Sequence, residues 1–324
     1  MGNMDELNLT NRNFNTISPS AKSLSLMKGH TNIPFARQTA ELLCYPEKYN
    51  PDFNKKDLTF WARTLHFENR YWSIDQLLAD LPFKNIIELS SGFSFRCLAT
   101  VKQKGFYYID TDLKDVIATK KDFIAAFSND TFKFDGKLEL LPLNALDDKQ
   151  FHEIVNHFPD GEIVIVNEGL LMYLNINEKK RLCSIIYDIL KERGGYWITA
   201  DIYIKNKNDK LNLRFDNKTT EFFEQHHIED NKFENFEEAE TFFRQMGLVI
   251  DKEANVKRSK LSSMKYFLKS STIRQIFKMR KVGKIQATWR SKIAPLKQKK
   301  MTTFKKCNTD TIHANKGISD FMNR

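Results

Sequence analysis

The stretch Ile-Ile-Glu-Leu-Ser-Ser-Gly-Phe-Ser-Phe-Arg, at residues 86–96, decides the fold prediction. It begins as an apolar strand, passes through a turn of small residues and continues as the start of a helix. A second apolar stretch at residues 106–109 leads to Asp110 and Asp112, which follow Gly92 by 18 and 20 positions. This layout is typical of a nucleotide-like cofactor site in a doubly wound sheet, where small residues admit the ligand and an acid binds the ribose hydroxyls.

Strand-like and helix-like patterns alternate along the rest of the chain. We expect strands at residues 85–89, 106–109, 138–141, 162–166, 196–202 and 248–250, with helices at 95–103, 113–127, 149–157, 177–193 and 236–246. This alternation predicts an α/β fold, in which helices cover both faces of a sheet. Helical spacing at 21–43, broken at 32–34, and at 58–81 predicts helices before the first strand, the second one ending at Pro82.

These patterns divide the chain into predicted segments. We expect a disordered lead at 1–15, an N-terminal helical cap at 16–82, an α/β domain at 83–295 and a basic disordered tail at 296–324. Residues 205–235 interrupt the alternation with polar and charged side chains. Long insertions of this kind often form lids or substrate walls, so we interpret this one as a lid.

The net charge of +10 hides an uneven distribution. Residues 254–306 contain 17 Lys and Arg and no Asp or Glu, whereas the rest of the chain holds 34 basic and 41 acidic residues. A basic block of this kind favours a weak contact with an anionic surface. A solvated lysine-rich surface is a slightly better interpretation, and nothing indicates specific binding of nucleic acid.

The cysteines and histidines exclude several kinds of site. The four cysteines have no paired spacing, which disfavours a disulfide framework or a zinc site and predicts a reducing, cytoplasmic compartment. No apolar run of 18 residues exists and the N-terminus is polar, so we expect neither a membrane span nor a signal peptide. His226 and His227 lie among acids without a metal-ligand spacing, so we expect no metal, although His227 could serve as a base.

Four segments together resemble a known family. Residues 87–96 resemble the first motif of the leucine carboxyl methyltransferase family, and residues 109–113 resemble its second. The run Asn-Glu-Gly-Leu-Leu-Met-Tyr-Leu at 167–174 is similar to the most recognisable element of that family, and residues 28–36 resemble an N-terminal element of bacterial members. The family includes small-molecule O-methyltransferases of the polyketide type. The resemblance covers roughly residues 20–295.

The resemblance implies S-adenosylmethionine as the methyl donor. It also implies a class I methyltransferase fold, which is a doubly wound, seven-stranded, mostly parallel sheet. The last strand of that sheet, at residues 285–293, would be antiparallel. The cofactor-binding residues that it implies are Arg70, Glu88, Ser90, Gly92, Asp110, Asp112, Asn144, Ala145 and Glu168.

Within this set, each residue has an expected role. Arg70 would bind the methionine carboxylate, with Arg63 as a rival on nearly the same helix face. Ser90 and Gly92 would shape the loop under the cofactor, and Glu88 belongs to the same motif. Asp112, or else Asp110, would hold the ribose, and we prefer Asp112. Asn144 and Ala145 would contact the adenine edge, although Asn144 stands where aspartate is more usual.

The candidate catalytic residues are Glu168 and Tyr173. Glu168 follows an apolar strand and would face the ligand crevice at the carboxyl edge of the sheet. The alternative is an acid that stabilises a helix start. Tyr173 either lines the acceptor pocket or is a buried aromatic residue.

The sequence therefore predicts an S-adenosylmethionine-dependent O-methyltransferase that acts on a carboxylate or hydroxyl of a small molecule. A carboxylate acceptor needs no base, whereas a hydroxyl acceptor can need one. The alternatives are a protein C-terminal carboxyl methyltransferase and a non-catalytic binding module that keeps the fold. A nicotinamide dehydrogenase is disfavoured because the turn has one glycine where a dinucleotide fingerprint has three. The acceptor and the oligomeric state do not follow from the sequence.

Overall fold

The computed structural model describes residues 18–54, 56–127, 134–205, 217–276 and 283–295. The described residues up to Ala294 belong to one compact unit. The predicted lead at 1–15 and tail at 296–324 lie outside the described residues, as does the 206–216 part of the predicted insertion.

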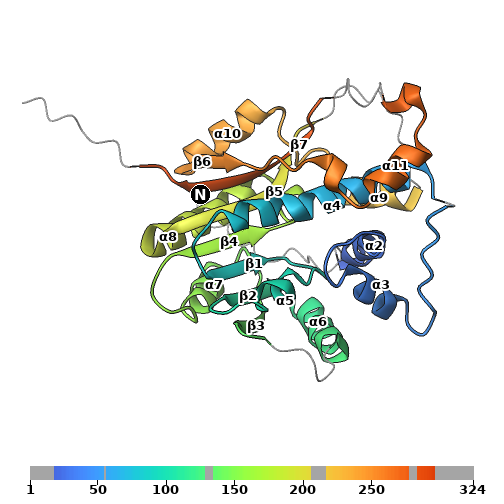
Figure 1. The fold of residues 1–324 in the computed structure, drawn as a ribbon. Coiled ribbons are helices and arrows are strands. Elements are labelled where there is room, and N and C mark those ends of the chain that lie inside the picture. The colour runs from blue at the N-terminus through green and yellow to red at the C-terminus, as the bar shows by residue number, and fades with distance from the viewer. Residues whose placement is uncertain (1–17, 55, 128–133, 206–216, 277–282, 296–324) are drawn as a thin grey trace, which may run out of the picture. The chain divides into compact units, whose positions relative to one another are not determined.

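Seven strands of the described chain form one sheet in the order β3-β2-β1-β4-β5-β7-β6 (Figure 1). The first five in sequence are parallel, and β7 is antiparallel to both β5 and β6. This confirms the predicted doubly wound α/β fold of seven strands with an antiparallel last strand. The strands are β1 (Asn85–Leu89), β2 (Tyr107–Asp112), β3 (Lys137–Pro142), β4 (Ile163–Asn167), β5 (Gly195–Tyr203), β6 (Leu248–Glu253) and β7 (Gln286–Ile293).

Helices precede the sheet and connect its strands. Before β1 come α2 (Ser18–Lys28), α3 (Ala36–Cys44) and α4 (Leu58–Ala79). Asp57 begins α4 by accepting the backbone N–H of Phe60. The later helices are α5 (Arg96–Thr100), α6 (Lys114–Phe127), α7 (Asp148–Val155), α8 (Ile176–Arg193), α9 (Asn217–Gln225), α10 (Phe236–Gln245) and α11 (Met264–Ser270), with single 3-10 turns η2 (Leu171–Tyr173) and η3 (Arg258–Lys260).

The core lies on both faces of the sheet because successive strand residues point to opposite sides. Ile86 and Val164 pack with residues of α4 and α5 on one face. Ile87 and Ile165 pack with α7, α8 and α10 on the other. On that face the ring of Trp197 stacks on a phenylalanine of α10. Buried central strands that are apolar on both sides are the type expected for a parallel sheet.

The order of the strands sets the position of the functional site. The chain runs from β1 outward to β3 and then returns to β4, which pairs with β1 on its other side. In open α/β sheets, ligands bind at such a switch point, outside the carboxyl ends of the strands. The loops after β1, β2, β3 and β4 therefore meet at one edge, with α2 and α4 beside them (Figure 1).

Strand β2 extends further than predicted. The apolar pattern ends at residue 109, but β2 continues to Asp112, where it still pairs with Pro142 of β3. The strand accommodates Asp110 because Lys120 of α6 neutralises its charge in the interior. A pattern of apolar residues alone does not predict such a buried pair.

Candidate active site

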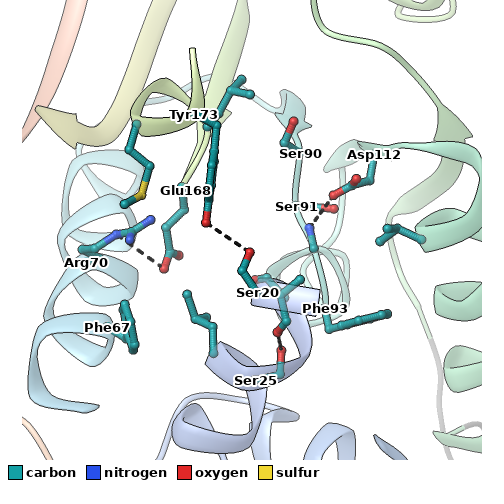
Figure 2. A pocket seen from close by; sticks show the side chains of 18 of the residues that line it. Ser20, Ser25, Phe67, Arg70, Ser90, Ser91, Phe93, Asp112, Glu168 and Tyr173 are labelled. Carbon is teal, nitrogen blue, oxygen red and sulfur yellow. Dashed lines mark hydrogen bonds and ion pairs between the residues drawn. The ribbon is translucent and has the colours of Figure 1, made fainter. Parts of the chain in front are cut away.

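A cavity of about 630 Å³ lies at the carboxyl edge of the sheet (Figure 2). Its lining comes from the loops after β1, β2, β3 and β4, from the end of β5, and from α2, α4 and α9. Segments that are far apart in the sequence therefore meet around it. Of the predicted site residues, those that line the cavity are Arg70, Ser90, Gly92, Asp112, Asn144, Ala145, Glu168 and Tyr173.

The loop after β1 forms one wall. Ser90 and Gly92 both have left-handed backbone conformations, with φ of 49° and 55°. The N–H of Gly92 donates to Oδ2 of Asp112 at 2.7 Å, and the N–H of Leu113 donates to Oδ1 at 2.7 Å. Burial raises the pKa of Asp112, although these two bonds oppose the shift. The carboxylate is thus fixed at the cavity with lone pairs left for a ligand.

Two predicted residues lie away from the cavity. Asp110 is fully buried and accepts bonds from Lys120 Nζ at 2.7 and 2.8 Å and from Ser91 Oγ at 2.5 Å. Glu88 is also fully buried and accepts bonds from Arg96 Nε at 3.3 Å and from a tyrosine hydroxyl at 2.6 Å. Asp110 and Glu88, which the resemblance implied as cofactor-binding residues, therefore lie outside the cavity lining. Internal cations hold both of these carboxylates.

Glu168 lies at the centre of a buried cluster of charges. Its Oε1 accepts a bond from Lys28 Nζ at 2.7 Å, and its Oε2 accepts one from Arg96 Nη2 at 3.0 Å. The Nε of Arg70 lies 3.9 Å from Oε1. Burial by itself raises the pKa of Glu168, but the three cations outweigh it and lower the pKa to about 2. Glu168 is therefore an ionised carboxylate and a weak base.

Arg70 joins this cluster to the end of β5. It donates from Nη2 to Asp201 at 3.3 Å and from Nη1 to the Tyr203 hydroxyl at 3.1 Å. Its Nε is buried and has no hydrogen-bond partner within the described residues. Its rival Arg63 also lines the cavity, and Arg70 forms an ion pair with Glu168. Arg70 thus presents a donor next to the cavity.

Asp201 supports the turn that follows β4, and sequence reasoning missed it. Its carboxylate accepts the backbone N–H groups of Gly169 and Leu170, both at 2.7 Å. It also accepts a bond from the side chain of Asn167 at 2.6 Å. This turn carries Glu168 into the cavity. Asp201 interrupts an apolar strand, and that interruption was the available signal.

His66 and Tyr203 form a second polar pair at the cavity. The distance from His66 Nε2 to the Tyr203 oxygen is 2.6 Å. Arg70 donates to the same oxygen, so the hydroxyl keeps its own hydrogen for a further bond. Burial and the charge of Arg70 lower the pKa of His66 to about 3. His66 is thus neutral near pH 7.

Tyr173 faces the N-terminal helix. Its hydroxyl donates to Ser20 Oγ of α2 at 3.1 Å (Figure 2). Its ring makes an edge contact with Phe222 of α9, inside the predicted insertion. Burial raises the pKa of Tyr173. Tyr173 therefore joins the turn after β4 to two segments that cover the cavity.

His227 does not belong to the site. Its side chain is 71% exposed, pairs with Asp230 at 3.4 Å and is not part of the cavity lining. The residue that the sequence offered as a base therefore lies outside the cavity lining. Across the residues that the structure describes, no group of three or more His, Cys, Asp or Glu side chains is placed to hold a metal. No helix in that part of the chain is long and apolar enough to cross a membrane.

The side chain of Asn144 accepts a hydrogen bond within its own turn. Its Oδ1 accepts the N–H of Leu146 at 3.1 Å, which shapes the turn after β3.

Sequence reasoning assigned no roles to Lys28 or Arg96, although both lie in the motifs that it singled out. The charge cluster that they form depends on residues far apart in the chain. Only the fold reveals it.

No family model matches the sequence, and no curated protein matches it. Solved structures are similar to it. A DUF574 family protein from Streptomyces avermitilis is 10% identical, with a TM-score of 0.51 over 84% of this chain and 97% of its own. An O-methyltransferase family protein from Burkholderia thailandensis is 12% identical, with a TM-score of 0.42 over 73% of this chain and 59% of its own. The first similarity supports the fold alone.

Proposed function

We propose that this chain binds S-adenosylmethionine at the carboxyl edge of the sheet and transfers its methyl group to an oxygen of a small molecule. One observation carries the proposal. Eight residues nominated from the sequence, drawn from α4 and from the loops after four strands, line a single cavity of about 630 Å³. The resemblance to the leucine carboxyl methyltransferase family supports the same function.

The cavity suits the parts of such a cofactor. The fixed carboxylate of Asp112 would accept the ribose hydroxyls. Apolar side chains near it, Val116, Leu143 and Leu146, would flank the adenine ring. The unpartnered Nε of Arg70 would donate to the cofactor carboxylate, and Glu168 would attract its ammonium group.

The residues lie in an order that fits an extended ligand. Figure 2 shows Arg70 and Glu168 on one side of the cavity and Asp112 on the other, with Ser90 near Asp112. The amino-acid end of the cofactor would thus lie towards α4 and the ribose towards β2. When bound, the sulfonium supplies an activated methyl group. The protein then needs mainly to align the acceptor and to exclude water.

A carboxylate is the acceptor that the lining favours. A hydroxyl acceptor profits from a base, but Glu168 has a pKa of about 2 and His66 one of about 3. Burial raises the pKa of Tyr203, so its hydroxyl stays neutral and donates. An acceptor that is already anionic needs no proton transfer. The positive charges of Arg63 and Lys232 on the lining suit such an anion.

The rest of the acceptor would be apolar. Side chains from α4, from the turn after β4 and from the segment at 217–232 contribute a hydrophobic wall made of Phe67, Met172, Phe222, Phe223 and Ile228. Contact with such a wall favours a compact hydrophobic acid. A protein chain terminus remains the alternative substrate.

The proposal is tested with methyl-labelled S-adenosylmethionine and a panel of aliphatic and aromatic acids, each paired with its alcohol. We expect label in a small product from some acids, released as methanol by alkali because it is an ester. The paired alcohols should remain unlabelled. Label in alcohols would contradict the carboxylate assignment, and label retained on protein would favour the chain-terminus alternative. A chain that binds the cofactor and labels neither class would be a non-catalytic module.

A further inference from the structure

A cationic surface with exposed apolar side chains lies over η3, α11 and the short helical turn that follows. We call it the α11 surface and define it by Lys257, Arg258, Lys260, Lys265, Leu268, Lys269, Ile273 and Arg274, all of which are exposed. Residues 254–276 contain six Lys and Arg and no Asp or Glu. The surface is part of the folded unit, because α11 packs on α4.

The helix α11 presents opposite sides to the core and to solvent. Phe267 is buried against Trp61 and its aromatic neighbours. Helical spacing places Lys265, Leu268 and Lys269 on the other side. Leu268 is 48% exposed between these two lysines. About half of this leucine therefore remains in contact with water.

Ile273 adds a second exposed apolar side chain beyond the end of α11. Its side chain is 76% exposed, and Arg274 next to it is exposed as well. Large apolar side chains at such exposure cost free energy in water unless another phase covers them. Lysine and arginine around protruding apolar side chains form the pattern of proteins that lie on a membrane interface.

We propose that the α11 surface docks on an anionic lipid bilayer, with Leu268 and Ile273 entering the boundary between headgroups and acyl chains. The cations complement the negative surface of such a bilayer. The two apolar side chains favour lipid over nucleic acid, because a phosphate backbone offers no acyl phase to receive them. Figure 1 shows α11 close to one end of α4, the helix that carries Arg70. A hydrophobic acceptor dissolved in lipid would thus be near the cavity.

The charge of Arg258 supports this proximity. It contributes to the lowered pKa of His66, a residue of the cavity lining. The edge of the α11 surface thus lies within electrostatic range of the cavity. The docking proposal itself does not depend on methyl transfer, and its test needs no substrate.

The test is co-sedimentation of the full chain with vesicles of phosphatidylcholine alone and of phosphatidylcholine mixed with phosphatidylserine. We expect binding to the mixed vesicles only, weakened by added salt. The double variant Leu268→Ser with Ile273→Ser should bind about tenfold more weakly, because it loses two buried apolar side chains. The matched control Ile176→Ser removes an isoleucine that is 50% exposed on α8 and should bind like the unchanged chain.

Three results would overturn the proposal. One is no binding to the mixed vesicles. Another is equal binding by the chain and the Leu268/Ile273 double variant, which would assign the contact to charge alone or to another segment. The third is tighter binding to duplex DNA than to mixed vesicles. Unchanged melting temperatures of the variants would show that folding is not the cause of a loss.

Discussion

Lys28 Nζ lies 2.7 Å from Oε1 of Glu168, a residue 140 positions later in the chain. Both side chains are almost fully buried, at 7% and 4% exposure. The pair joins the end of α2 to the end of β4 and closes the cavity between them. The pair thereby links α2 to the turn after β4.

Replacing Lys28 by Met should destabilise the fold by about 2–4 kcal/mol, because it leaves a buried carboxylate with one cation fewer. Urea denaturation measures the free energy of unfolding. The double variant Lys28→Met with Glu168→Gln should lose less than the sum of the two single changes. Additive losses would contradict a direct interaction between the two side chains.

A surface pair provides the control. Lys205 Nζ lies 2.6 Å from Oε1 of Glu234, but both side chains are largely in contact with water, at 34% and 42% exposure. Lys205→Met should therefore cost less than about 1 kcal/mol. A cost equal to that of Lys28→Met would show that burial is not the source of the effect.

His66 should make the fold sensitive to mild acid. Its pKa falls from 6.5 in the unfolded chain to about 3 in the folded one, so below pH 6.5 the unfolded chain binds more protons. The stability that a neutral His66 provides is complete above pH 6.5 and is lost as the pH falls towards 3. Between pH 6.5 and 5 we expect a loss of up to about 1.4 kcal/mol per pH unit from this group.

The variant His66→Phe should flatten that slope, measured by urea denaturation at a series of pH values. His227→Asn changes a histidine that is 71% exposed and should leave the slope as it is. The range above pH 5 avoids the titration of Glu168, whose contribution is lost between its ordinary pKa of 4.5 and its folded value of about 2. An unchanged slope in His66→Phe would contradict the neutral state assigned to His66.

The sequence predicts which loops form this site better than it predicts which charged side chains pair within it. The small-residue turn at 90–92 and the acid Asp112 follow from local patterns, and both lie at the cavity. Asp110 has the same local signal as Asp112, but it pairs with Lys120 of the next helix. Whether an acid faces a ligand or a buried lysine depends on packing between elements, which a local pattern does not contain.

The hydrogen bonds and ion pairs that hold the site together could not be predicted from the sequence for a related reason. Asp201 holds the turn after β4 from a neighbouring strand, more than 30 positions away. Lys28 reaches Glu168 from a helix that lies 140 positions earlier in the chain. Neither pairing produces a periodic pattern in the sequence, because each one depends on the order of the strands in the sheet. The strand order was not predicted from the sequence, because the family resemblance implied only a seven-stranded sheet with an antiparallel last strand.

The hydroxyl of Tyr173 should act as a tie to α2 and not as a base. Tyr173→Phe and Ser20→Ala each remove the same 3.1 Å bond. We expect each to lower stability by about 1 kcal/mol and the pair together to lower it by little more than one alone. Methyl transfer, measured as initial rate against pH, should keep its profile in both. A profile changed by Tyr173→Phe alone would contradict this role.

Asp201→Asn should loosen the turn that carries Glu168. The amide has one acceptor oxygen in place of two, so buried N–H groups of Gly169 and Leu170 lose part of their bonding. We expect a loss of about 2–4 kcal/mol in unfolding free energy by urea denaturation. Asp188→Asn, on the exposed side of α8, should change it by less than about 0.5 kcal/mol. Equal effects would refute the supporting role of Asp201.

Binding of S-adenosylhomocysteine, followed by isothermal titration calorimetry, tests the central claim most directly. The chain should bind it at one site, and Asp112→Ala should weaken the affinity at least about tenfold by removing the proposed ribose contact. Asp115→Ala, on the nearby α6 and outside the cavity lining, should leave it unchanged. No detectable heat and no thermal shift at millimolar ligand, from a protein that melts cooperatively, would contradict the assignment of the cavity.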